Sequence, residues 1–194
     1  MLATPGIIRS KILKKQRECL LRLSEIPEHE IKKEIKYYNE ALDMVTNVKD
    51  VQSLKSELYK YLENTFEDFP THFKPDKMSK EDYLEASIDD LTTPWFLYFC
   101  NYDPAPTLEK VSCCVLALNG QKDWQVQPKE NLSAISDALI RRGNKNITIN
   151  EIPNLNHLFQ ECKTGAPEEY GSIKQIFSPV ALEEILNWVI IHVK

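Results

Sequence analysis

The chain has 194 residues, of which 42% are hydrophobic, and a formal net charge of −5, so it can form one globular domain with a sizeable core or one domain with a large insertion. The 29 acidic and 24 basic side chains are spread along the sequence, and the lack of a basic face argues against a nucleic-acid partner. No apolar run has membrane-spanning length and the first residues do not resemble a signal peptide. Five cysteines without a C-x-x-C pair favour a reduced, cytoplasmic setting over a disulfide framework or a zinc site.

Residues 7–91 are predicted to be helical. Apolar side chains recur at helical spacing in three stretches: Ile8, Ile12, Cys19, Leu20 and Leu23; Ile31, Ile35, Tyr38, Leu42 and Val45; and Val51, Leu54, Leu58, Tyr61 and Leu62. Ser79 and Asp82 resemble the start of a fourth, short helix. Residues 66–77 read as an aromatic loop that packs onto another part of the protein. The segment is either a helical bundle or a lid inserted into an α/β domain, and helices alone do not decide between them.

The stretch 92–100 is unusually aromatic and contains Trp95 and Phe96. Such a segment is too apolar for a solvated helix, so we expect it to lie in a groove beneath the lid, as core or as the wall of a pocket. The prolines of residues 102–106 then turn the chain.

The rest of the chain alternates strands and helices. Residues 111–118 form a continuous apolar run that includes Cys113 and Cys114, which is typical of a parallel strand buried on both faces. A helix is expected over 128–142 and a second strand over 146–152. A last helix follows Ser178 and carries a wide apolar face made by Leu182, Ile185, Leu186, Val189 and Ile190. This order is half of a doubly wound α/β architecture.

Each predicted strand is followed by a residue with catalytic chemistry. Asp123 follows the first strand and His157 follows the second, and ligand chemistry gathers at the carboxyl ends of parallel strands. An aspartate beside a histidine orients the imidazole and stabilises its charge during nucleophilic catalysis. The alternatives are a solvated turn aspartate after Asn119 and Gly120, and a loop histidine that bonds the backbone.

The segments LNGQKD, ending at Asp123, and LNHLF, around His157, resemble the acid and histidine segments of the α/β-hydrolase family, in particular of its serine-aminopeptidase-like and acyl-esterase-like members. The resemblance implies a partial α/β-hydrolase fold. Residues 1–6 would be the remnant of a core strand, 7–91 a helical lid, and 92–194 the C-terminal part of the core. It also implies hydrolysis of a small ester or amide through an acyl-serine in the complete enzyme, with neither metal nor cofactor. The site residues expected on this basis are catalytic Asp123 and His157, and substrate-binding Trp95, Phe96, Trp124 at the rim, and Phe159.

The sequence departs from the family at the nucleophile. None of the five glycines flanks a serine in a G-x-S-x-G pattern, and Ser172, after Gly171, lies in a late loop. Cys162 could pair with His157, although a loop thiol is more often inert. One alternative is therefore an inactive fragment or binding module with half of the fold. Because the expected sheet has an open edge, we expect self-association or an N-terminal partner chain that supplies the serine.

Overall fold

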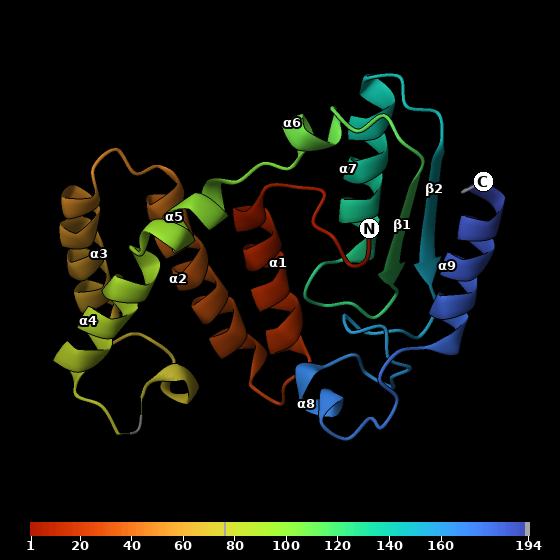
Figure 1. Cartoon of the computed structure of the whole chain (residues 1–194). Coiled ribbons are helices and arrows are strands. Elements are labelled where there is room, and N and C mark those ends of the chain that lie inside the picture. The colour runs from red at the N-terminus through yellow and green to blue at the C-terminus, as the bar shows by residue number, and fades with distance from the viewer. Residues whose placement is uncertain (76, 193–194) are drawn as a thin grey trace. The chain divides into compact units, whose positions relative to one another are not determined.

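The computed structural model describes residues 1–75 and 77–192, and it divides the chain into two compact units (Figure 1). An α/β unit comprises Met1–Ile8 and Asp103–Lys194, and a helical unit comprises Arg9–Tyr102. The described chain is mixed α/β, mainly helical, with two parallel strands. None of its helices combines the length and the apolar character that a membrane crossing requires.

The helical unit contains α1 (Arg9–Arg22), α2 (Glu28–Thr46), α3 (Val51–Thr65), α4 (Lys80–Leu91) and α5 (Pro94–Asn101), with a 3-10 turn, η1 (Thr71–Phe73). The three predicted amphipathic helices are confirmed, and their apolar faces meet in one core around Leu42, Val45 and Leu58, each with no exposed surface. Side-chain caps begin α3 and α4, because Asp50 accepts a hydrogen bond from the Ser53 amide and Ser79 accepts one from the Asp82 amide.

Most of the aromatic stretch 92–100 lies in helix α5, and Trp95 and Tyr98 are exposed on it, so the expectation that the stretch is too apolar for a solvated helix is wrong. Thr93 caps this helix by accepting a hydrogen bond from the Phe96 amide. The helix belongs to the helical unit, and the boundary between the units falls after Tyr102 rather than after Leu91. Phe96 packs against the core of that unit, whereas Trp95 is 67% exposed and stacks on Phe99. Trp95 is therefore not a core residue of its unit.

The α/β unit is built on β1 (Val115–Gly120) and β2 (Ile147–Ile152), which pair in parallel with Val115 opposite Ile147. Helix α7 (Pro128–Arg141) covers one face of the strands and α9 (Pro179–His192) covers the other (Figure 1). Short helices α6 (Ala105–Leu108) and α8 (Pro167–Tyr170) complete the unit. All six β1 residues are buried, as the continuous apolar run predicted.

Alternation along the strands explains the two covered faces. Val115 and Ala117 point to the α7 side, and Leu116 and Leu118 point to the α9 side. The expected start of the first strand was wrong, because Cys113 and Cys114 precede β1 and Cys113 is exposed. The residues before Val115 are consequently not constrained to opposite faces of the sheet.

The first residues of the chain lie along the free side of β1. Leu2 forms an isolated parallel bridge with Leu118, and the Ala3 amide donates to the Leu118 carbonyl at 3.0 Å. The Met1 amino group donates to the Leu116 carbonyl at 2.6 Å. Ala3 then adopts a φ of 44°, which ends the pairing. Met1–Ala3 therefore lie beside β1 through a single bridge, and Met1 and Leu2 are exposed rather than buried.

Helix α9 uses only part of its apolar surface. Ala181, Ile185 and Trp188 face the strands, and the Trp188 indole donates to the Thr148 hydroxyl at 2.9 Å. The rest of the predicted apolar face points away from this core, with exposed fractions between 39% and 65%, at Leu182, Leu186, Val189 and Ile190. The described α/β unit therefore ends in an uncovered apolar stripe.

Candidate active site

The carboxyl ends of β1 and β2 approach each other closely. The Gln121 amide donates to the Ile152 carbonyl and the Lys122 amide donates to the Leu155 carbonyl, both at 2.9 Å. Glycine is required at position 120, because a Cβ there would lie 2.3 Å from the Leu155 carbonyl oxygen. These contacts hold the loop after β1 against the loop after β2.

Asp123 lies in the loop after β1 and has no exposed surface. Its Oδ1 accepts hydrogen bonds from the amides of Gln125 at 2.9 Å and Val126 at 2.8 Å. Its Oδ2 lies 2.9 Å from Nδ1 of His157. One oxygen is thus fixed by the local turn, and the other points at the imidazole.

His157 is held in the loop after β2 by its neighbour Asn156, which is fully buried. The Asn156 Oδ1 accepts hydrogen bonds from the amides of Leu158 at 3.0 Å and Gln160 at 2.9 Å. Because a carboxylate only accepts hydrogen bonds, Nδ1 of His157 carries the proton, and the neutral ring leaves Nε2 as an acceptor. The His157 side chain is 27% exposed, which gives a reacting group access to the ring.

A loop formed by residues 161–172 is attached to the Asp123 turn. Lys122 Nζ donates to the Lys163 carbonyl and Trp124 Nε1 donates to the Thr164 carbonyl, both at 2.8 Å. Glu169 closes the loop by accepting hydrogen bonds from the Thr164 hydroxyl at 2.7 Å and from three successive amides, Lys163, Thr164 and Gly165. These bonds, led by the one from the Thr164 hydroxyl, lower the pKa of Glu169 to about 2. Trp124, expected at the rim of a pocket, serves here as an anchor for this loop.

Two polar side chains near the pair were not expected from the sequence. The side-chain Nε2 of Gln125 donates to the Tyr170 hydroxyl at 3.1 Å. Burial raises the pKa of Tyr170, and the negative charge of Asp123 acts in the same direction. Tyr170 follows His157 by 13 residues and ends the short helix α8, so no periodic pattern in the sequence signals its approach to Asp123.

The other expected substrate-binding residues belong to the core of the α/β unit or to the helical unit. Phe159 is only 2% exposed and stacks on Phe177, with ring centroids 5.3 Å apart, which makes it a core residue rather than the wall of a pocket. Trp95 and Phe96 belong to helix α5 of the helical unit.

Three side chains that could act as nucleophiles are engaged elsewhere. The Cys162 thiol donates to the Asn154 carbonyl at 3.3 Å, and burial raises its pKa, which disfavours the reactive thiolate. The Ser172 hydroxyl donates to the Glu169 carbonyl at 2.8 Å, and the Ser178 hydroxyl donates to a Glu161 carboxylate oxygen at 3.3 Å. Cys162 is therefore not activated as a partner of His157.

Within the described residues, no group of three or more His, Cys, Asp or Glu side chains is arranged to hold a metal ion. Comparisons with models of protein families, with curated proteins and with solved structures found no significant match to this chain.

Proposed function

We propose that this chain carries the acid and the histidine of an α/β-hydrolase-type site that cleaves an ester or an amide. The observation that carries the proposal is the 2.9 Å contact between His157 Nδ1 and the fully buried Asp123 carboxylate. The two groups follow adjacent parallel strands, at the edge of a sheet where catalytic groups gather in α/β folds. Asp123 also receives two backbone hydrogen bonds, so its position does not depend on His157.

In this proposal Nε2 of His157 acts first as a general base and then as a general acid. It takes the proton from a serine hydroxyl as that oxygen attacks the substrate carbonyl carbon, and Asp123 stabilises the imidazolium that forms. The histidine then gives the proton to the leaving alcohol or amine as the bond to the carbonyl carbon breaks. A water molecule repeats the sequence on the acyl-serine and releases the acid.

The nucleophilic serine would come from a segment or a partner chain outside these 194 residues, since the sequence has no glycine-flanked serine of the required type.

The test is labelling by a fluorophosphonate probe, which reacts with activated serines. The chain would be co-expressed with the peptide encoded immediately upstream of Met1. We expect labelling of a serine in that peptide, and His157→Gln should slow the labelling by about 10³-fold or more. His29→Ala is the matched control, because His29 is exposed on α2 of the helical unit. Equal labelling rates in the His157→Gln and wild-type complexes would contradict the proposal.

A second candidate is a binding module without activity of its own. It is favoured by the engagement of Cys162, Ser172 and Ser178 in other hydrogen bonds, since a histidine without a nucleophile has nothing to activate. Absence of labelling in the co-expressed complex, in a protein that forms the Asp123–His157 hydrogen bond in solution, would favour this second candidate.

A further inference from the structure

The helical unit contains a pocket that is separate from the chemistry of Asp123 and His157. Its volume is about 360 Å³, within the range of small-molecule sites. Aromatic rings from α2, α4 and the segment between α3 and α4 form much of its wall, namely Tyr37, Tyr38, Phe66, Phe69, Phe73 and Tyr83. The pocket is therefore suited to a flat, largely apolar group.

One carboxylate in this pocket is buried, and only one of its two oxygens accepts a hydrogen bond. Glu34 is 2% exposed, and its Oε1 accepts a hydrogen bond from Arg17 Nε at 2.6 Å. Its Oε2 has no hydrogen-bond partner among the residues that the structure describes. Buried polar atoms in native proteins are nearly always hydrogen-bonded, so this oxygen marks a position that a donor should occupy.

Arg17 decides what kind of donor fits. Its guanidinium pairs with Glu34 and lies over the rings of Tyr38 and Phe73, 5.6 and 5.7 Å from their centroids. The negative charge of Glu34 is thereby already balanced, and a cationic ligand would face the positive charge of Arg17. A neutral N–H or O–H group avoids that repulsion.

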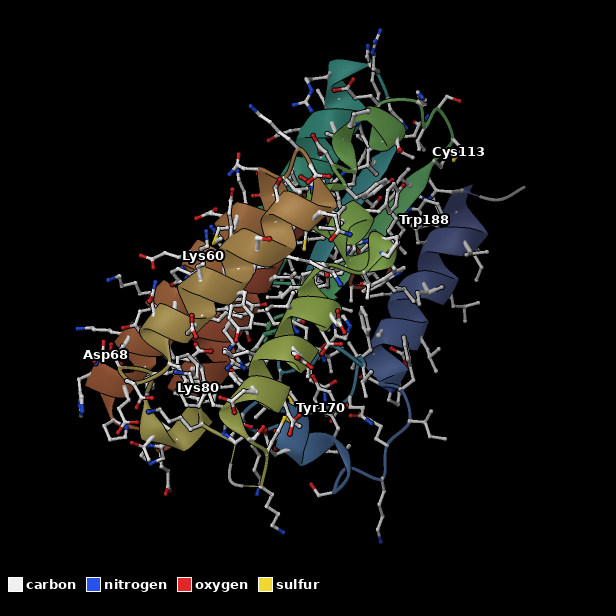
Figure 2. All side chains as sticks on the ribbon, turned by 90° about the vertical axis from the view of Figure 1, so that its left-hand side faces the viewer. Lys60, Asp68, Lys80, Cys113, Tyr170 and Trp188 are labelled. Atoms are coloured by element: carbon white, nitrogen blue, oxygen red, sulfur yellow. The ribbon has the colours of Figure 1, made fainter. Side chains whose placement is uncertain are left out.

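The residues that close the pocket are fixed by charged side chains. Asp68 accepts hydrogen bonds from Tyr37 and Lys33, and Lys80 lies over the Phe66 ring at 5.2 Å. Figure 2 shows Asp68 and Lys80 at the same end of the helical unit, around the segment that joins α3 to α4. This segment, which supplies Phe66, Phe69 and Phe73, is therefore held in place beside Glu34 before any ligand arrives.

We propose that this pocket binds a small aromatic molecule that donates one neutral hydrogen bond to Oε2 of Glu34. The rings of the pocket supply most of the contact area, and Glu34 selects for the donor. A site built around an unpaired buried acceptor rejects an analogue that lacks the donor, because binding then seals the acceptor away from any partner.

Indole and 1-methylindole test the proposal, because they share an apolar body and differ in the N–H donor. We expect indole to bind the full chain at least ten times more tightly than 1-methylindole in NMR titrations, with shifts at Phe69 and Tyr83. Glu34→Gln turns an amide N–H₂ toward the pocket and should weaken indole binding at least tenfold while leaving 1-methylindole unchanged. Glu40→Gln is the control, since Glu40 lies on the same helix but is exposed and bonds the Tyr61 hydroxyl.

Ser87→Leu provides a second test should Glu34→Gln perturb the fold. Ser87 lines the pocket, and a larger apolar side chain there should fill it and abolish binding of both compounds in a protein with unchanged circular dichroism. Equal affinity of the wild-type chain for indole and 1-methylindole would overturn the role of Glu34. Absence of binding by both compounds, or binding that survives Ser87→Leu, would overturn the site itself.

Discussion

At the scale of single residues, the two oxygens of Asp123 have different partners. Oδ1 accepts from the Gln125 and Val126 amides and Oδ2 accepts from His157. The backbone bonds fix the carboxylate whether or not the histidine is present, so the direction of the hydrogen bond to the imidazole is set by Asp123. The position of the Asp123 carboxylate therefore determines which imidazole nitrogen of His157 carries the proton.

We predict that Asp123→Asn reverses the tautomer of neutral His157. The amide oxygen should keep the bonds from Gln125 and Val126, which leaves the N–H₂ group facing Nδ1 and moves the ring proton to Nε2. The loss of a charge-assisted bond should also lower the free energy of unfolding by about 1–2 kcal/mol. Long-range ¹H–¹⁵N correlation spectra of the imidazole above its titration range would report the tautomer. Asp137→Asn, at an exposed position of α7, should change neither quantity.

Gly120 provides a second prediction at the residue scale. Alanine at this position would place Cβ 2.3 Å from the Leu155 carbonyl oxygen and 2.7 Å from that of Asn156, and backbone atoms cannot move aside cheaply. We expect Gly120→Ala to lower the free energy of unfolding by about 2–3 kcal/mol. Gly171→Ala is the matched control, because nothing lies within 4 Å and φ is −68°. That variant should be neutral or stabilise by about 0.5 kcal/mol in denaturant unfolding. Equal effects of the two substitutions would mean that the strand ends are not in close contact.

At the scale of elements, Glu169 on α8 holds the 161–172 loop in its conformation through hydrogen bonds. It accepts hydrogen bonds from three successive amides and one hydroxyl, so its charged form is favoured in the folded chain. The same loop holds the Asp123 turn through Lys122 and Trp124. The protonation state of this one glutamate is therefore coupled to the order of a segment beside the candidate site.

We predict that this loop loosens in acid. The folded pKa of Glu169, about 2, lies below the ordinary value of 4.5, so its contribution to stability is fully present above pH 4.5 and is lost as the pH falls toward 2. Hydrogen exchange at the Thr164 and Gly165 amides, corrected for the intrinsic rate, should rise in that interval. Glu169→Gln should raise exchange already at neutral pH, whereas Glu168→Gln, next to it on α8, should not. If exchange in the wild-type chain stays constant from pH 6 to pH 2, the Glu169 carboxylate does not hold this loop.

At the scale of the whole molecule, the α/β unit has an apolar stripe without a partner in the described residues. Leu182, Leu186, Val189 and Ile190 recur at i, i+4, i+7 and i+8 along α9 and are all exposed. A contiguous stripe of this kind favours association, in contrast to an isolated apolar residue such as Ile176, which is 89% exposed.

We predict that the chain self-associates through this stripe at micromolar concentration. Leu186→Lys combined with Ile190→Lys should shift the sedimentation coefficient to that of a monomer and leave the helical circular dichroism intact, because both side chains point away from the core of the unit. Ile176→Lys, at the isolated position, should leave the association unchanged. A wild-type chain that remains monomeric across the micromolar range would show that the stripe is stable in water.

The sequence by itself determined most of the elements of this protein, because their signals are local. Helical spacing in residues 7–91 predicted three helices, and the continuous apolar run before Asn119 predicted a strand buried on both faces. The order of Asp123 and His157 after two successive strands was also sufficient to expect that they would meet, since the ends of adjacent parallel strands lie at one edge of the sheet.

Only the tertiary structure decided which apolar side chains are covered. Phe159 looked like a pocket residue but stacks on Phe177 in the core, and most of the predicted apolar face of α9 has no layer to pack against among the described residues of the α/β unit. The attachment of Glu169 and Trp124 to distant backbone atoms had no periodic signal, and the half-satisfied carboxylate of Glu34 had none either. The physical reason is that periodicity reports which face of an element is apolar. Which partner covers that face depends on contacts between residues far apart in the chain.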